Sequence, residues 1–127
     1  MIVVDASVAV SALLNEGVAR DLLQRQHVHV PHLIDSEVVS GLRGRVLGRR
    51  ITAENGRTAL RAWSRLGVIR YPLVGLLERI WELRENASAY DAGYVALAED
   101  LGCSLVTADS RLARRSGLRC SVTVVPN

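Results

Sequence analysis

Short apolar runs alternate with longer amphipathic stretches along the whole chain of 127 residues. Runs rich in Val, Ile and Leu predict five strands, at residues 2–4, 28–30, 68–71, 105–107 and 122–125. Apolar residues at helical spacing predict helices between them, at residues 8–14, 18–26, 32–49, 53–66, 76–83, 89–101 and 110–115. This alternation is typical of an α/β domain with helices on both faces of a parallel sheet.

Several side chains refine this prediction. Ser7, Thr52 and Ser88 precede helical stretches and are expected to cap them, because a hydroxyl can accept from a free backbone N–H. Trp63 and Trp81 fall on apolar helix faces, where we expect them to lie in the core or in an interface. We therefore expect one domain over residues 1–127, a three-layer α/β/α fold with a five-stranded parallel sheet.

The composition limits the setting of the protein. Hydrophobic residues make up 49% of the chain, and no uncharged run is long enough to span a bilayer. The start, Met1 to Val4, has no basic segment of the kind that begins a signal peptide, so we expect a cytoplasmic protein with no membrane association. Cys103 and Cys120 fit that setting as buried free thiols, and a bridge between them is the less expected alternative.

All 16 basic residues are Arg, and the formal net charge is +3. The absence of Lys has an ordinary explanation in a genome that favours Arg codons. It is equally compatible with phosphate recognition, for which the guanidinium group is well shaped. Four arginines gather near the end of the helix expected at 32–49: Arg43, Arg45, Arg49 and Arg50. They are either a solvated helix end or phosphate contacts, and Arg43 and Arg45 are the candidate contacts.

Four acids stand at strand ends or helix starts: Asp5, Glu37, Asp91 and Asp109. Each alone has an ordinary explanation as a helix cap or a solvated acid. Together they fall on one edge of the sheet, because in a parallel sheet every strand ends where the next helix begins. Four converging carboxylates resist ionisation unless cations are present, which predicts bound Mg²⁺, with Mn²⁺ as a substitute.

The segments around these acids resemble the PIN-domain family and, within it, the VapC-type toxins of bacterial toxin–antitoxin pairs. They are IVVDAS at 2–7, PHL at 31–33, EVVSGLR at 37–43, SAYDAGYVALAE at 88–99 and TADSRL at 107–112. The resemblance covers the whole chain and implies a metal site of one Glu and three Asp at the four positions above. The chain departs from the pattern at Leu112, where an aromatic residue is frequent, and this affects packing rather than chemistry.

The resemblance also implies an activity, the metal-dependent endonucleolytic cleavage of RNA, for example tRNA or rRNA. Asp5, Asp91 and Asp109 would hold the metal, and Glu37 would orient the attacking water, complete the coordination or help to hold a second, weaker metal ion. Ser7 and Thr107 match hydroxyl residues that contact a metal-bound water or the phosphate.

The partners implied by the resemblance are an RNA substrate and an antitoxin protein that inhibits the enzyme. The resemblance also implies that the chain forms a homodimer and a hetero-oligomer with the antitoxin. The apolar helix expected at 8–14 has its default place in the core, and the resemblance raises the alternative that it forms, with the helix at 18–23, a groove that binds the antitoxin. A non-catalytic PIN-like scaffold for RNA or protein is the alternative, and the presence of all four acids argues against it. A phosphotransfer domain is disfavoured because Ser7 stands where a second acid is needed, and a dinucleotide site because no glycine-rich loop follows the first strand.

Overall fold

The computed structural model describes residues 1–127 as a five-stranded sheet in the order β3-β2-β1-β4-β5, with every neighbouring pair parallel. The strands are β1 (Ile2–Val4), β2 (Val28–Pro31), β3 (Ile69–Tyr71), β4 (Ser104–Thr107) and β5 (Val122–Val124). The helices are α1 (Ala6–Leu14), α2 (Val18–Arg25), α3 (Ile34–Leu47), α4 (Ala53–Arg65), α5 (Leu77–Glu82), α6 (Ala89–Leu101) and α7 (Ser110–Ala113), with a 3₁₀ turn η1 (Val74–Leu76) before α5. The predicted α/β fold with an all-parallel sheet is therefore confirmed.

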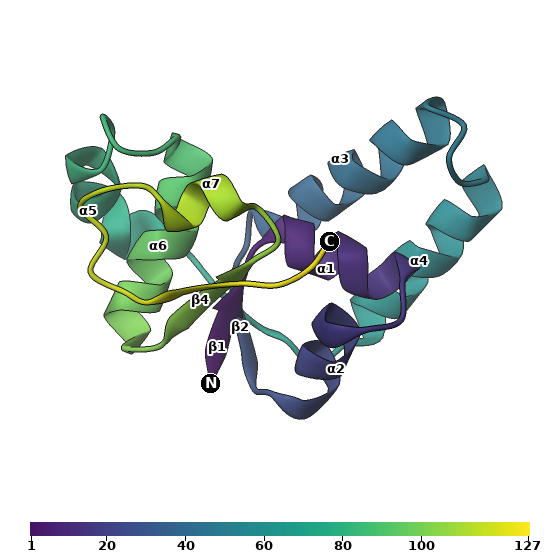
Figure 1. The fold of residues 1–127 in the computed structure, drawn as a ribbon, viewed down its shortest axis with the longest axis horizontal. Helices are drawn as coiled ribbons and strands as arrows, with labels where there is room; N and C mark the ends of the chain where they lie inside the picture. The colour runs from purple at the N-terminus through teal and green to yellow at the C-terminus, as the bar shows by residue number, and fades with distance from the viewer.

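The helices divide into two groups on either side of the sheet. Figure 1 shows α1 to α4 on one side and α5 to α7 on the other, with α3 and α4 projecting as an antiparallel pair. The three inner strands are buried on both faces, as Val30 in β2, Val3 in β1 and Leu105 in β4 show. One apolar cluster of 26 buried residues joins both helical layers through the sheet. Continuous apolar strands of this kind are what a sheet covered on both faces requires.

Helix starts follow the local chemistry of the sequence with one correction. Thr52 and Ser88 cap α4 and α6 as predicted, accepting from backbone N–H groups at 3.0 and 3.1 Å. Ser7 was expected to cap the first helix, but the cap is Asp5, whose carboxylate accepts from the Val8 N–H at 3.2 Å. Ser7 lies inside α1, where its hydroxyl donates to that same carboxylate. The helix consequently begins directly at the end of β1.

The tryptophans have different environments. Trp63 is buried in the core at 3% exposure, as expected, whereas Trp81 is 68% exposed. Trp81 therefore does not belong to the core. Leu112 is almost fully buried, so an aliphatic side chain fills the buried position of α7. None of the helices has the length and apolar content needed to cross a membrane.

A polar network braces the first turn of α3. The Arg70 guanidinium donates to both Asp35 carboxylate oxygens at 2.8 and 2.9 Å, and the Trp63 indole N–H donates at 2.7 Å. These bonds join α3, α4 and β3, and Arg70 also lies over the Trp63 ring. The Arg70 hydrogen bonds hold the pKa of Asp35 below its usual value, against burial. Asp35 is thus fully compensated, and it fixes the turn from which Glu37 projects.

Candidate active site

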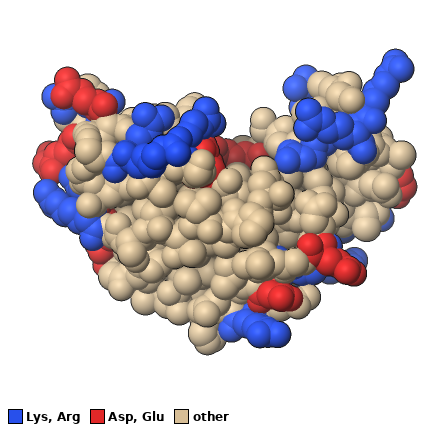
Figure 2. Space-filling model, in the orientation of Figure 1, with Lys and Arg blue, Asp and Glu red and all other residues tan.

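The four predicted acids all come from the edge of the sheet where the strands end. Asp5 follows β1 and caps α1, Asp109 follows β4 and caps α7, and Glu37 and Asp91 lie in the first turns of α3 and α6. Figure 2 shows a notch between the α5–α7 lobe and the α3–α4 lobe, with acidic side chains on its floor and arginines on both rims.

Asp5 lies at the centre of a hydrogen-bond network and is 6% exposed. Its Oδ1 accepts from the Ser7 hydroxyl at 2.5 Å, and its Oδ2 accepts from the Thr107 hydroxyl at 2.5 Å. Ser7 also accepts from the Ala108 N–H at 2.9 Å, so it bridges α1 to the segment after β4. In this structure the two predicted hydroxyl residues hold Asp5. No cationic side chain pairs with it.

Glu37 is held by Tyr94, a residue that sequence reasoning missed. The fully buried Tyr94 hydroxyl donates to Glu37 Oε1 at 2.5 Å. Burial raises the pKa of Glu37, the charges of Asp91 and Asp5 raise it further, and the Tyr94 bond opposes them in part. Burial and the neighbouring Glu37 raise the pKa of Tyr94, so it remains a donor. One signal was present in the sequence: Tyr94 is a polar-tipped residue one helical turn after Asp91 in an otherwise apolar run.

Asp91 has no protein partner for its carboxylate. Only its backbone N–H is engaged, through the cap formed by Ser88, so the reciprocal half of a capping box is missing. Burial raises the pKa of Asp91, and the charges of Asp5 and Asp109 add to this effect. No side chain donates to this carboxylate, so its negative charge is left to be balanced by a ligand that binds in the notch.

Asp109 is the one acid of the four that has a cationic partner. Its Oδ1 accepts from the Arg111 N–H at 2.9 Å, and the Arg111 guanidinium donates to both oxygens at 3.1 Å. These contacts lower the pKa of Asp109. Sequence reasoning found the capping role of Asp109 but missed its pairing with Arg111.

The structure brings the charges together without forming a closed coordination sphere. No three acidic, histidine or cysteine side chains lie close enough to hold one metal ion. Even so, Asp91 experiences the charges of both Asp5 and Asp109, and Glu37 experiences those of Asp91 and Asp5. The donors are carboxylates flanked by hydroxyl groups, with no thiolate or imidazole among them. This donor set fits a hard divalent cation such as Mg²⁺ or Mn²⁺.

Arginines line both rims of the notch (Figure 2). Of the two α3 arginines predicted as RNA contacts, Arg43 is exposed and lines a surface groove between α3 and α4. Arg45 donates to the Gly41 carbonyl at 3.1 Å and lines a cavity beside α1 and α4. The opposite rim carries exposed arginines on and after α7, and two of them, Arg111 and Arg115, lie near enough to Asp91 to lower its pKa. Sequence reasoning named only the α3 group. The run RLARR at 111–115 was the signal for the second.

Comparison with known proteins finds one family over most of the chain. The profile of the PIN domain matches residues 2–118. Ribonuclease VapC9 of Mycobacterium tuberculosis is 60% identical over 126 residues, which cover 99% of both chains. Ribonuclease VapC1 of the same species is 45% identical, over 97% of this chain and 96% of that protein.

Two solved structures share the fold. VapC20 of Mycobacterium tuberculosis, a sarcin–ricin loop cleaving toxin, superposes with a TM-score of 0.64 at 20% identity, over 93% of this chain and 96% of that one. PAE2754 from Pyrobaculum aerophilum superposes with a TM-score of 0.72 at 24% identity, over 97% and 83%. At these identities the two structures support the fold alone.

Proposed function

Since the chain belongs to the PIN-domain family, among the VapC ribonucleases of toxin–antitoxin systems, we propose that its four acids form a metal-dependent endoribonuclease site. The observation that supports the proposal is that three acids of the notch have no positively charged partner within the chain. Asp5, Glu37 and Asp91 gather at one edge of the sheet with no arginine paired to any of them. Sixteen arginines are available in the chain, so this arrangement favours an external divalent cation as their partner.

In the proposed mechanism each residue has a separate task. A bound Mg²⁺ supplies positive charge for the scissile phosphate and acidifies water. Asp5, Asp91 and Asp109, which do not lie close enough together in this structure to hold one ion, would have to draw closer to bind it, with Asp5 kept in orientation by Ser7 and Thr107. Tyr94 occupies only Oε1 of Glu37, which leaves Oε2 free to orient the attacking water, and the raised pKa suits Glu37 to take up its proton. Because water attacks instead of the ribose 2′-hydroxyl, the products carry 5′-phosphate and 3′-hydroxyl ends.

The test compares two Asp→Asn variants on one helix. Asp91→Asn should lower RNA cleavage in Mg²⁺ by about 100-fold or more, because metal catalysis is worth several kcal/mol. Asp100→Asn, on the exposed end of α6, should cleave like the wild type. EDTA should stop cleavage, and product ends should be read by phosphatase and ligase sensitivity. Cyclic-phosphate products that persist in EDTA would rule out the metal mechanism.

We propose that arginines on both sides of the notch bind RNA phosphates, with Arg43 and Arg45 on α3 and Arg115 after α7. The two rims lie on opposite sides of the acids, so a structured RNA such as tRNA or rRNA would place the scissile phosphate between two bound backbone segments. RNA binding by the Asp91→Asn protein should depend on salt, and Arg43→Gln or Arg115→Gln should each reduce the slope of log K against log salt by about one. An unchanged slope would remove that rim from the proposal.

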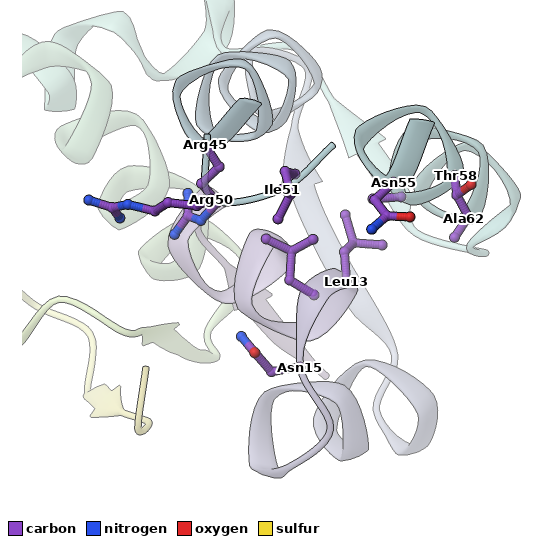
Figure 3. A pocket seen from close by; sticks show the side chains of 10 residues that line it. Leu13, Asn15, Arg45, Arg50, Ile51, Asn55, Thr58 and Ala62 are labelled. Carbon is purple, nitrogen blue, oxygen red and sulfur yellow. The ribbon is translucent and has the colours of Figure 1, made fainter. Parts of the chain in front are cut away.

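We propose that the antitoxin binds the groove between α1, α2 and α4. Two adjoining cavities of about 480 and 280 Å³ share Leu13 and Ala62 as lining residues. Figure 3 shows Leu13 and Ile51 facing the larger cavity, with Arg45 and Arg50 beside it. An apolar segment with flanking acids complements this surface. Leu13→Glu should abolish antitoxin binding while RNA cleavage persists, and retained binding would place the antitoxin elsewhere.

RNA and an antitoxin made alongside the toxin are both cytoplasmic, so the proposal includes a cytoplasmic location. The homodimer implied by the family resemblance stays a prediction.

A further inference from the structure

The two cysteines lie side by side where β4 and β5 begin. Leu105 of β4 pairs with Val122 of β5 in the parallel register. Cys103 comes two residues before Leu105, and Cys120 comes two residues before Val122. The pairing persists beyond the strand ends, since the Leu105 N–H donates to the Ser121 carbonyl at 3.0 Å and the Ser104 and Ser121 hydroxyl groups lie 2.6 Å apart. Besides burial, Cys103 also raises the pKa of the Cys120 thiol, because the two groups are near neighbours.

The backbone is anchored on both sides of the pair. The Cys103 N–H donates to the Ala98 carbonyl at 3.0 Å, and the Arg119 N–H donates to Glu99 Oε2 at 2.7 Å. Both anchors belong to the last turns of α6. Neighbouring strands lie about 4.8 Å apart. That spacing falls within the Cα separation of about 4.4–6.8 Å that a disulfide needs.

The thiols can be reached by a small reagent. Cys103 and Cys120 are both free and half-buried, and they line the same surface cavity of about 280 Å³. Burial raises the pKa of each thiol, so few thiolates form at neutral pH and reaction should be faster in alkaline buffer. The active-site acids lie at the other end of β4, so the mechanism proposed above uses neither cysteine.

We propose that Cys103 and Cys120 form a dithiol modification site that a peroxide converts to an intramolecular disulfide. One thiolate attacks a peroxide oxygen: an S–O bond forms, the O–O bond breaks, and the departing oxygen leaves as water after taking a proton. The second thiol then attacks the sulfenic sulfur, so that the S–S bond forms, the S–O bond breaks and a second water leaves. In total the two thiols lose two electrons and two protons, and one peroxide is reduced to two waters.

The disulfide would close residues 103–120 into a loop that contains Thr107, Asp109 and Arg111. A cross-link of this kind stabilises a protein mainly by restricting the unfolded chain. Oxidation should therefore raise the Tm, and a thiol reductant should reverse the rise.

The test is a peptide map of the wild-type protein after hydrogen peroxide treatment and alkylation of the remaining thiols. Trypsin places Cys103 in residues 85–111 and Cys120 in residues 120–127, so a cross-link joins two separable peptides. We expect both thiols to disappear together, a mass lower by two hydrogens, the linked peptide pair, and full reversal by dithiothreitol. Cys103→Ser and Cys120→Ser should show no rise in Tm on oxidation.

Three results would overturn the proposal: oxygen addition at one cysteine with the other still alkylated, a disulfide between two chains in place of the internal one, or two thiols that stay unmodified at alkaline pH. The wild-type map decides among these outcomes even if a serine variant fails to fold.

Discussion

Two charged clusters of this molecule are built in opposite ways. In the α5–α6 lobe, Glu99 accepts from the Arg79 guanidinium at 2.7 and 3.1 Å and from the Arg119 N–H at 2.7 Å. Burial alone would raise the pKa of Glu99, but these donors hold it below its usual value. In the notch, burial and neighbouring carboxylates raise the pKa of both Glu37 and Asp91. Glu99 is paired with an arginine of the same chain, whereas Glu37 and Asp91 have no arginine paired with them.

The difference separates structural acids from functional ones. A carboxylate with an arginine fork has all the donors it needs, so its cluster ties elements together; Arg79 also donates to the Gly117 carbonyl at 2.7 Å. Acids that crowd without counter-charge cost folding energy, and such a cost is expected where a ligand supplies the missing charge. Removing one acid from each cluster should therefore change stability in opposite directions.

The largest change in stability is expected from Glu99→Gln. The substitution removes the negative partner of Arg79, whose side chain is only 17% exposed. The loss should be about 1–3 kcal/mol, with RNA cleavage per folded molecule unchanged. Urea unfolding measures it, and Glu85→Gln, an exposed glutamate after α5, is the matched control that should change little. Equal effects of the two substitutions would remove the distinction between the clusters.

Asp91→Asn should act in the opposite direction and more weakly. Without metal, loss of the repulsion from Asp5 and Asp109 should raise the Tm by up to about 4 °C, the shift that 1 kcal/mol produces in a domain of this size. Added Mn²⁺ should raise the Tm of the wild type and of Asp100→Asn but not that of Asp91→Asn. Thermal unfolding with and without EDTA measures both effects. A variant that still gains stability from Mn²⁺ would take Asp91 out of the metal site.

The smallest effect is a dependence of stability on pH. The folded state raises the pKa of Glu37 and Asp91 above their ordinary values of 4.5 and 3.8, so above these values it holds more protons than the unfolded chain. Stability in EDTA should therefore fall as pH rises through the window between the ordinary and the raised pKa values. Urea titrations over this window should give a shallower decline for Glu37→Gln than for the wild type. Parallel curves would show that Glu37 is not strained in the folded state.

The fold and the positions of the acids could be predicted because they depend on local patterns. Apolar strands, capping residues and strand-end acids can each be recognised from a short segment of the sequence. A parallel sheet then brings the strand-end acids to one edge. The Tyr94–Glu37 and Arg111–Asp109 contacts could not be predicted, because partner choice depends on packing and on side-chain conformation.

Asp35 and Glu37 show this limit on one turn of helix. Two residues in a helix point about 200° apart, so these acids face opposite sides of α3. Asp35 meets Arg70 and Trp63, whereas Glu37 meets Tyr94. The sequence alone does not show which of the two acids forms the structural pair with Arg70. Glu37 was predicted as a site residue from its place near a helix start and from the family resemblance, and neither indicated its contact with Tyr94.

The third helix has one fixed end and one free end. Its buried residues are Ile34, Val38 and Leu42, all in the first three turns, and beyond them it projects with α4 away from the sheet (Figure 1). Substitutions beyond Leu42 can change the outer surface without moving the turn that carries Glu37. Natural substitutions there can therefore change which RNA or protein the surface binds without changing the active-site acids. Relatives of this chain are expected to differ most along the projecting α3–α4 pair and to keep their acids in place.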